Sequence, residues 1–364
     1  MKKLVLTPPA NILQDKPETN TSEPVQDISP IINSICPVEL VKIITSPQNI
    51  NYLYNFINCM DSLKLTRLEK ILTVTTGKQV TITSPCPCAN FTVSIPRNNR
   101  DIIPFKKCLL TKSFDNATGL SFIAGKDQNN LTRCYDLATL PHLLIAGATG
   151  SGKSVVLNNI ICSLLYKNTP ETLSFIMIDC KRVELSQYNP LPHLFMPVIT
   201  TPEGAKKALV KALELIQTRY KILEKKGLKT GNFTRLIIVI DELADLILQG
   251  KTSIEPLLIR IAQIGRACNV HLILATQKPS ASVITGLLAA NIPGKICLKC
   301  SRVQDSITII GHKGGERLTG AGDCIIKTPD TTSETRLQAP YISGQDIQSI
   351  VQYWKKPDKA KRAG

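Results

Sequence analysis

From about residue 118 onward, short apolar runs alternate with longer amphipathic stretches. The apolar runs end in polar or small residues, which is typical of buried strands. We predict strands over 143–146, 173–179, 195–200, 236–241, 271–276 and 295–301. Because the stretches between several of these runs have helical spacing, the pattern predicts an α/β fold with a mostly parallel sheet covered on both faces. Ligands of such sheets bind at the carboxyl ends of the strands.

The clearest helix is predicted over 202–226. Thr201 can cap this helix, and Pro202 suits its first turn. The apolar stripe of the helix consists of Leu209, Ala212, Leu213, Ile216, Tyr220 and Leu223. Helical spacing also predicts helices over 155–167 and 254–268.

The ends of the chain differ from its middle. The first 33 residues contain Pro8, Pro9, Pro17, Pro24 and Pro30 among polar residues. That composition predicts a disordered tail over 1–33, because it offers little apolar surface to bury. Residues 355–364 are predicted to form a short basic tail.

Between the first tail and the alternating region, residues 34–117 predict a small α/β domain. We expect a helix over 51–72, a hairpin over 71–82 around Gly77, and a strand over 90–96. The larger α/β domain is then predicted over 118–354.

A glycine-rich loop, GATGSGKS, follows the first strand of the larger domain and precedes a predicted helix. It fits the pattern G-x-x-x-x-G-K-[ST], in which backbone N–H groups and a helix N-terminus bind the phosphates of a nucleotide. The predicted nucleotide site consists of Gly147, Ala148, Thr149, Gly150, Ser151, Gly152, Lys153, Ser154 and Val155. Lys153 would reach the β- and γ-phosphates of ATP, and Ser154 would bind Mg²⁺. The alternative is a chance glycine-rich turn.

Two adjacent carboxylates end the strand predicted over 236–241. Asp241 is placed to hold Mg²⁺, and Glu242 is placed to act as general base on the attacking water. The alternative is an ordinary acidic turn after a strand.

Other polar residues at the ends of predicted elements have two interpretations. Gln277 follows the strand predicted over 271–276 and could sense the γ-phosphate, although many strands end in a polar residue. Arg266 lies late in the helix predicted over 254–268. It could act across a subunit boundary as an arginine finger, or it could pair with the helix dipole or a carboxylate.

The composition favours a polyanionic partner. Lys and Arg number 44 against 28 Asp and Glu, which gives a net charge of +16. Such an excess attracts nucleic acid or an anionic membrane surface. No apolar run is long enough to span a membrane, and the N-terminus is a poor signal peptide. We therefore expect a cytoplasmic protein.

The chain has 12 cysteines, most of them within apolar runs. Free buried thiols are expected in a reducing compartment. Cys86 with Cys88, and Cys297 with Cys300, are close enough in sequence to suggest a metal site. The second pair lies in a predicted strand, where residues three apart face opposite ways, and this argues against joint metal binding.

Several longer motifs surround these residues. In chain order they read PHLLIAGATGSGKS, MIDCKRVELSQYN, RYKILEKKG, IVIDELADL, RIAQIGRACNVHLILATQKPS, VITGLLAANIPGKI and LTGAGDCII. This series resembles the FtsK/SpoIIIE family of DNA-translocating motor ATPases. The resemblance is close from about residue 124 to 326 and weaker near 80–97.

The resemblance implies a RecA-like P-loop NTPase core, preceded by a small α/β subdomain. It further implies a homo-hexameric ring that uses ATP and Mg²⁺ and threads double-stranded DNA through its centre. Arg266 matches the position of the family's arginine finger. Thr276 and Lys278 match one DNA-contacting loop, and Arg302 lies in the second.

The chain departs from the family pattern at several positions. Cys180 replaces proline in a D-P-K motif, Ala289 stands where lysine is common, and Ile307 replaces a usual arginine near Arg302. These changes concern the strength and path of DNA contact. The basic residues that could compensate are Lys295, Lys299, Lys313 and Arg317.

The leading hypothesis is an ATP-driven translocase of double-stranded DNA, of the kind used in chromosome segregation and DNA transfer. One alternative is a related motor that moves a protein cargo, and another is a nucleotide-gated DNA-binding protein. No membrane anchor precedes residue 33 and no winged-helix module follows Trp354, so we expect a stand-alone motor with a separate recruiting or orienting partner.

Overall fold

The computed structural model describes residues 7–15, 27–57, 62–84, 89–98, 101–329 and 334–355. Contacts within the chain divide it into two units. The small unit comprises 16–103 and 126–131, and the large unit comprises 1–15, 104–125 and 132–364. The division thus falls at residue 104, whereas the sequence pattern placed it at 118.

The small unit contains a four-stranded antiparallel sheet in the order β1-β2-β4-β3. Its elements are α1 (Ser29–Asn33), β1 (Val38–Thr45), β2 (Asn49–Phe56), α2 (Ser62–Thr76), β3 (Thr81–Thr83) and β4 (Phe91–Pro96). Its core includes the buried side chains of Tyr52, Tyr54, Leu68, Leu72 and Phe91. The strand predicted over 90–96 is confirmed as β4.

Two predictions for this unit are wrong. Residues 51–56 lie in β2, and the helix spans only 62–76. β2 pairs with both β1 and β4 and is rich in aromatic residues, so it is a central strand, which periodicity alone does not distinguish from a buried helix. The hairpin predicted around Gly77 is the end of α2, because Gly77 takes a left-handed φ of 65° that terminates the helix.

The large unit is built on a nine-stranded sheet in the order β6-β5-β13-β12-β11-β7-β10-β9-β8. The strands are β5 (Ser121–Asp127), β6 (Thr132–Asp136), β7 (Leu143–Ala146), β8 (Leu173–Ile178), β9 (Arg235–Ile240), β10 (Val270–Thr276), β11 (Gly294–Leu298), β12 (Asp323–Lys327) and β13 (Thr335–Gln338). The five strands β11, β7, β10, β9 and β8 are parallel, and β12 and β13 join antiparallel. The predicted α/β fold with parallel central strands is confirmed.

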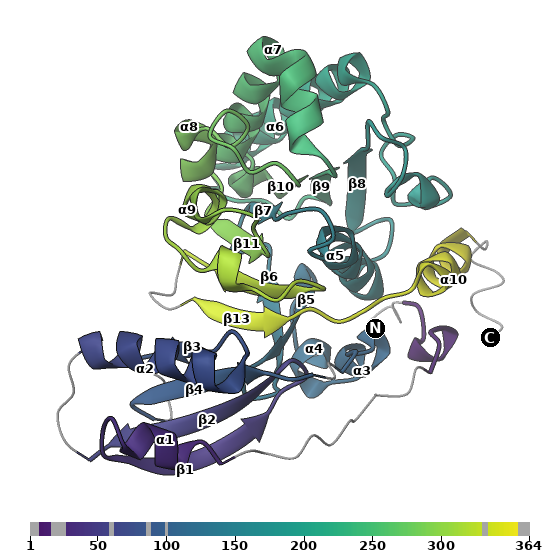
Figure 1. Ribbon diagram of the computed structural model, residues 1–364. Helices are drawn as coiled ribbons and strands as arrows, with labels where there is room; N and C mark the ends of the chain where they lie inside the picture. The colour runs from purple at the N-terminus through teal and green to yellow at the C-terminus, as the bar shows by residue number, and fades with distance from the viewer. Residues whose placement is uncertain are drawn as a thin grey trace. The chain divides into compact units, whose positions relative to one another are not determined.

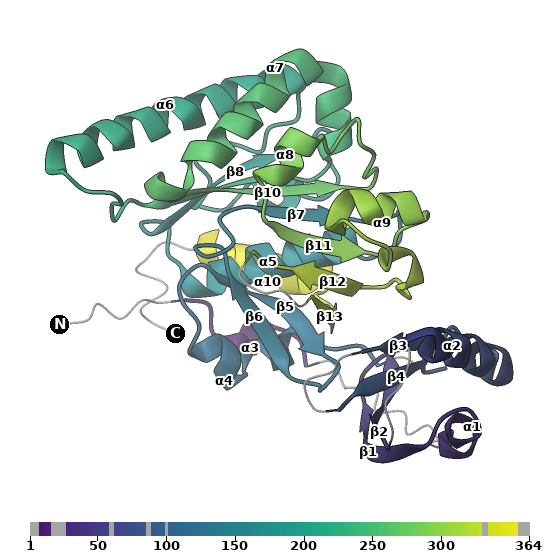
Figure 2. The same cartoon turned by 90° about the vertical axis from the view of Figure 1, so that its left-hand side faces the viewer.

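Helices of the large unit pack on both faces of its sheet. They are α3 (Phe105–Leu109), α4 (Lys112–Asp115), α5 (Lys153–Lys167), α6 (Pro202–Lys226), α7 (Leu243–Ile264), α8 (Gly286–Ala290), α9 (Val303–Ile310) and α10 (Gly344–Lys355). Within this unit, α6 to α9 lie on one side of the sheet, and α5 and α10 lie on the other (Figure 1). Figure 2 shows the same arrangement from the side.

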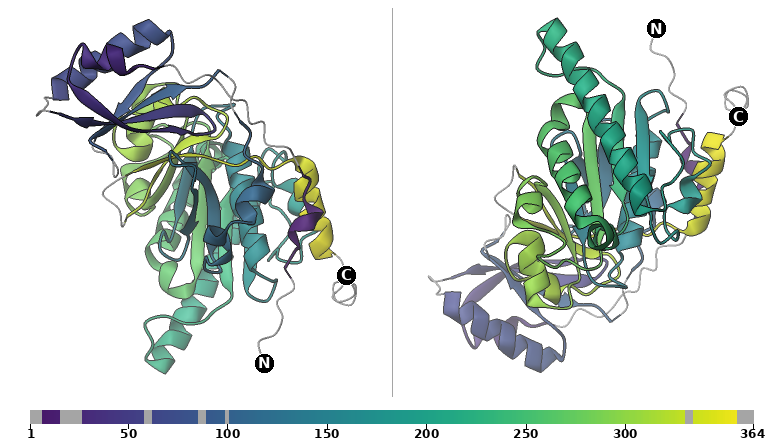
Figure 3. Two further views of the ribbon diagram at one scale, coloured as in Figure 1. Left: turned by 90° about the horizontal axis from the view of Figure 1, so that it is seen from below. Right: turned by 90° about the horizontal axis from the view of Figure 1, so that it is seen from above.

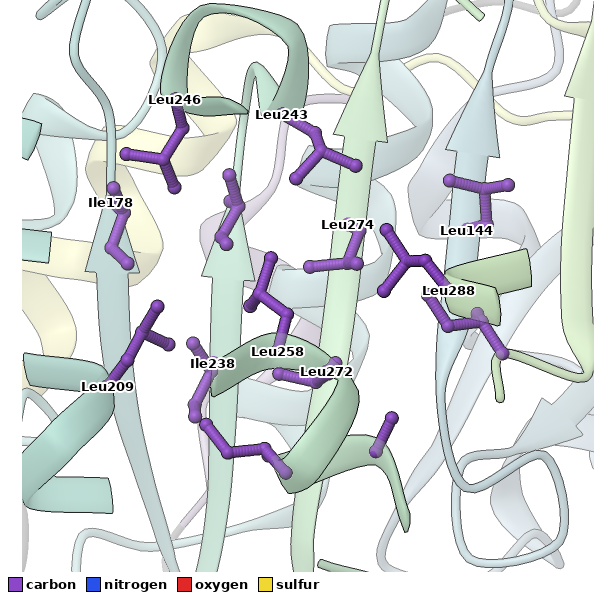
Figure 4. Packing of buried hydrophobic residues seen from close by; sticks show 14 of the residues in the cluster. Leu144, Ile178, Leu209, Ile238, Leu243, Leu246, Leu258, Leu272, Leu274 and Leu288 are labelled. Atoms are coloured by element: carbon purple, nitrogen blue, oxygen red, sulfur yellow. The ribbon is translucent and has the colours of Figure 1, made fainter. Parts of the chain in front are cut away.

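The larger core lies between the sheet and the layer formed by α6, α7 and α8. Leu209 of α6, Leu258 of α7 and Leu288 of α8 meet Ile238 of β9 and Leu274 of β10 there (Figure 4). The helices α6 and α7 run side by side (Figure 3). This core fixes the ends of β9 and β10, from which functional side chains project.

The helix prediction over 202–226 is confirmed as α6. The Thr201 hydroxyl accepts a hydrogen bond from Gly204 N at 3.1 Å, and Gly227 ends the helix with a φ of 61°. The helix predicted over 254–268 begins earlier, at Leu243, and a short 3₁₀ turn over Arg266–Cys268 follows it.

The strand predicted over 195–200 is wrong. This segment makes only isolated bridges to β8, Phe175 with Leu194 and Ile178 with Ile199. Pro197 lies between the two bridges, and it lacks the N–H that a continuous ladder requires.

The disordered tail predicted over 1–33 is wrong for its described residues. In the large unit, a 3₁₀ turn over Ala10–Ile12 packs on α10, Leu13 is buried, and Gln14 N donates to Asp346 Oδ1 at 2.9 Å. In the small unit, α1 buries Ile32 in the core. The basic tail predicted over 355–364 lies outside the described residues from 356 onward. Among the helices that the structure describes, none is long and apolar enough to cross a bilayer.

Candidate active site

The glycine-rich loop connects β7 to α5, as predicted. Gly150 and Gly152 take left-handed φ values of 78° and 100°, which favour glycine. A Cβ on Gly152 would lie 2.6 Å from the backbone N of Gly322, so this position also lacks space for a side chain. Ala148 N donates to Lys299 O at 2.8 Å, which ties the loop to the end of β11.

The loop has the features that a triphosphate requires. In the described part of the chain, no protein acceptor takes the N–H groups of Thr149, Gly150 or Gly152. The Ser151 hydroxyl is buried without a hydrogen-bond partner. These donors surround the N-terminus of α5, where the helix dipole favours an anion. The donor set therefore fits the phosphates of ATP.

Lys153 and Asp241 form a buried ion pair. Lys153 Nζ lies 2.7 Å from Asp241 Oδ1 and also donates to the main-chain oxygen of Asp241 at 2.6 Å. The two side chains are only 3% and 5% exposed. The structure thus joins the residue predicted to bind phosphate to the residue predicted to bind Mg²⁺.

Ser154 has a partner that the sequence analysis missed. Its hydroxyl donates to Glu184 Oε1 at 2.6 Å. Glu184 lies in the loop after β8, within the motif MIDCKRVELSQYN. The sequence offered one signal for Glu184, namely a charged residue in a motif that follows a predicted strand. The position of Glu184 in the sequence did not indicate that it contacts Ser154.

Glu242 lies at the carboxyl end of β9 and caps α7. It accepts hydrogen bonds from Ala244 N at 3.4 Å, from the Thr276 hydroxyl at 2.7 Å, and from Gln277 N at 3.2 Å. Lys181 Nζ lies 3.7 Å from Glu242 Oε2. The carboxylate is therefore held in one orientation, as a general base requires.

Lys181, from the D-C-K motif, interacts with two acidic residues. Its ammonium lies 3.3 Å from Asp245 in addition to its contact with Glu242. Partial burial lowers the pKa of Lys181, but the negative charges of Glu242 and Asp245 outweigh this effect and raise the pKa above its ordinary value. Lys181 consequently stays charged beside the predicted base.

The structure corrects the prediction for Thr276. This side chain is fully buried, and its hydroxyl donates to Glu242, so it does not offer a surface to DNA. Gln277 does reach the glycine-rich loop, since the Thr149 hydroxyl donates to Gln277 Oε1 at 2.8 Å. The end of β10 therefore contacts both the predicted base and the predicted phosphate loop.

The residues predicted to contact DNA other than Thr276 are exposed. Lys278 follows β10, and Arg302 precedes α9, beyond the end of β11. Lys299 is also exposed at the end of β11. Lys295 is half-buried near the start of β11, away from these residues, so it does not add to their charge.

Arg266 is not part of the site formed by this chain. It is exposed and lies just before β10 begins, whereas Gln277 lies just after β10 ends. The strand rise places these positions about 20 Å apart.

The structure tests the prediction for only one of the two cysteine pairs. Cys86 and Cys88 lie outside the described residues. Cys297 and Cys300 are buried with their sulfurs 3.6 Å apart, because β11 ends at Leu298 and the chain turns before Cys300. The expectation that they face opposite ways is wrong. The hydrogen bond between the Cys297 and Cys300 thiols, together with burial, raises the pKa of Cys297. No group of three metal-ligating side chains occurs among the described residues.

Comparisons with known proteins show which proteins this chain resembles. The sequence profile of the FtsK/SpoIIIE family matches residues 106–235 and 230–281. The chain is 37% identical over 299 residues to the DNA translocase FtsK of Streptococcus pneumoniae, an alignment that covers 77% of this chain and 39% of that protein. It is 36% identical over 305 residues to the DNA translocase FtsK of Lactococcus lactis, covering 78% of this chain and 40% of that protein.

Among solved structures, the pCW3 conjugation coupling protein TcpA shares the fold with a TM-score of 0.63 at 21% identity. It covers 90% of this chain and 97% of that one. The type VII secretion ATPase EccC of Thermomonospora curvata has a TM-score of 0.60 at 22% identity, covering 70% of this chain and 34% of that one. These two structures share the fold, whereas the family profile and the relatives at 36–37% identity over more than three quarters of the chain show that the chain belongs to the FtsK/SpoIIIE family.

Proposed function

We propose that this chain is the ATP-hydrolysing motor part of a double-stranded DNA translocase. The observation that carries the proposal is the 37% identity to a protein named DNA translocase FtsK, in a chain that joins Lys153 of the glycine-rich loop to Asp241 and holds Glu242 beside them. The chain spans about two fifths of that relative, so the proposal concerns the motor part. In this proposal, the large unit is the RecA-like motor domain, and the small unit corresponds to the predicted α/β subdomain.

The residues of the glycine-rich loop bind the triphosphate in this proposal. The free N–H groups of the loop orient its oxygens, and Lys153 turns from Asp241 to the β- and γ-phosphates. Ser154 and Asp241 would hold Mg²⁺, which offsets negative charge on the phosphates when bound.

Glu242 then accepts a proton from the attacking water as general base. The hydrogen bonds from Thr276 and Gln277 N keep its carboxylate oriented for this step. Gln277 also contacts Thr149 of the loop, so it is placed to respond to the γ-phosphate.

A neighbouring subunit supplies the missing cation in this proposal. Arg266 is exposed before the amino end of β10, whereas the site of its own chain lies at the carboxyl ends of the strands. It can therefore act as an arginine finger only in the site of another copy. This arrangement requires a contact between neighbouring copies, and we propose that these copies form the homo-hexameric ring implied by the family.

The exposed residues Lys278, Lys299 and Arg302 support a DNA-facing surface. They follow β10 and β11, whose ends also contact the glycine-rich loop. With the chain's net charge of +16, they would bind phosphates without reading bases. We propose a cytoplasmic motor in DNA segregation or DNA transfer, with a separate recruiting partner.

The test measures ATP hydrolysis with and without duplex DNA, together with displacement of a triplex-forming strand. We expect duplex DNA to stimulate hydrolysis and the motor to displace the strand, and Glu242→Gln to abolish both. Wild-type protein that hydrolyses ATP but ignores duplex DNA and leaves the triplex intact would contradict the proposal.

The same assay separates the two alternatives. A motor for protein cargo would respond to a partner polypeptide and not to DNA. A nucleotide-gated DNA-binding protein would bind duplex DNA, yet wild type would hydrolyse ATP no faster than Lys153→Ala.

A further inference from the structure

The Ser154 hydroxyl and the Glu184 carboxylate form a short hydrogen bond at the first turn of α5. The distance of 2.6 Å from Ser154 Oγ to Glu184 Oε1 is typical of a hydroxyl that donates to an ionised carboxylate. The carboxylate of Asp241, the other predicted metal ligand, is meanwhile occupied by Lys153. The hydroxyl predicted to bind Mg²⁺ is thus oriented by an acidic residue from a different strand end.

The loop that carries Glu184 is held in place from both sides. The buried carboxylate of Asp179 accepts hydrogen bonds from the N–H groups of Glu184 at 3.0 Å and Leu185 at 2.9 Å. Further along, the fully buried Tyr188 donates its hydroxyl to Asn158 of α5 at 2.7 Å. Because Asn158 and Ser154 share one helix, the loop is anchored to the element that it serves.

The chemistry of a hydroxyl gives this contact a role beyond packing. A serine hydroxyl has one hydrogen and two lone pairs, and it rotates freely unless a partner fixes it. Since Glu184 accepts the hydrogen of Ser154, both lone pairs remain available to a hard cation, which prefers oxygen ligands in strict geometry. Carboxylates that orient a metal ligand in this way affect metal affinity strongly.

We propose that Glu184 is a positioning residue that orients Ser154 as a ligand of Mg²⁺. This inference rests on the proposed use of ATP and Mg²⁺. It assigns a role to Glu184, the second of the two acidic residues in the motif MIDCKRVELSQYN, which lies beside α5. The positive φ of 59° at Arg182 shows that the loop adopts an unfavourable backbone conformation two residues before Glu184.

The test follows binding of a fluorescent N-methylanthraniloyl ATP analogue, in EDTA and across a Mg²⁺ titration, without DNA. We expect Glu184→Gln to raise the Mg²⁺ concentration at half-saturation by about 10- to 100-fold, and to leave the affinity in EDTA unchanged within about twofold. Glu214→Gln, on the exposed face of α6, is the matched control and should behave as wild type. An unchanged Mg²⁺ midpoint, or an equal loss of affinity in EDTA, would overturn the proposal.

A double-variant cycle separates positioning from direct metal binding. In a Ser154→Ala background, Glu184→Gln should shift the Mg²⁺ midpoint by less than about twofold, because the hydroxyl that it orients is gone. A full shift in that background would show that Glu184 acts without Ser154 and would refute the positioning role. If duplex DNA stimulated ATP hydrolysis by the wild type but Glu184→Gln left the Mg²⁺ midpoint unaltered, only this inference would be refuted. If Glu184→Gln shifted the Mg²⁺ midpoint of nucleotide binding but duplex DNA did not stimulate hydrolysis by the wild type, only the translocase proposal would be refuted.

Discussion

Removing Lys153 should destabilise the large unit even when no nucleotide is present. Its ammonium is 2.7 Å from Asp241 Oδ1, with both side chains at most 5% exposed. At an effective dielectric constant near 20, the direct attraction over this distance is about 6 kcal/mol, against which desolvation of both groups must be set. Breaking such a buried pair from one side leaves an uncompensated carboxylate, so we expect Lys153→Ala to cost about 3–5 kcal/mol in the free energy of unfolding.

Urea unfolding followed by tryptophan fluorescence measures this effect. The chain has one tryptophan, Trp354, which is buried in α10 and packs edge-on against His193, so its emission reports on the large unit. Because urea slopes are about 3 kcal/mol per molar for domains of moderate size, the midpoint should fall by roughly 1 M or more.

Two further variants make the reasoning testable. Adding Asp241→Asn to Lys153→Ala should recover much of the lost stability, because no buried charge then remains unpaired. Lys211→Ala, at an exposed position of α6, is the matched control and should shift the midpoint very little. If Lys153→Ala and Lys211→Ala unfolded at the same urea concentration, the pair would contribute nothing in the nucleotide-free protein.

Other predictions follow from the contacts of the site and its surroundings. Thr276→Val keeps the shape of the side chain but removes the hydrogen bond to Glu242; steady-state kinetics should show kcat lowered by about tenfold with nucleotide affinity unchanged, and an unchanged kcat would contradict the orienting role. Gly152→Ala should abolish binding of a fluorescent ATP analogue, because the residue has a φ of 100° and its Cβ would lie 2.6 Å from backbone nitrogen; binding at wild-type affinity would refute this. Burial lowers the pKa of His142 to about 3 and of His271 to about 4, so the unfolded chain takes up these protons first as pH falls below 6.5. For each histidine, the free energy of unfolding should drop by up to about 1.4 kcal/mol per pH unit between pH 6 and its folded-state pKa. Urea unfolding of His271→Asn across this range should give a shallower slope than wild type, and equal slopes would exclude His271 as a contributor.

Much of the fold was predictable because its signals are local. Apolar runs such as 143–146 and 236–241 identify buried strands by composition, and Thr201 with Gly227 marks the ends of α6. The errors occurred where local signals are ambiguous. The aromatic run at 51–56 suits a strand or a helix, and only its pairing with β1 and β4 decides between them.

The site was predictable in its members but not in its contacts. The structure brings Lys153, Asp241, Glu242 and Gln277 together at the carboxyl ends of the parallel strands, as the pattern of strand ends predicts. It gives Thr276 a different role, because its buried hydroxyl faces Glu242 across 34 residues of sequence.

The sequence by itself determined which chemistry this protein carries: a phosphate-binding loop needs its glycines, lysine and serine in fixed order, and that order is written in consecutive residues. Only the tertiary structure decided which side chains face one another. Ser154 and Glu184 are 30 residues apart, and the 2.6 Å between their oxygens depends on how β8, its loop and α5 pack. Side-chain orientation at this scale comes from long-range packing and buried hydrogen bonds, which a pattern of neighbouring residues does not encode.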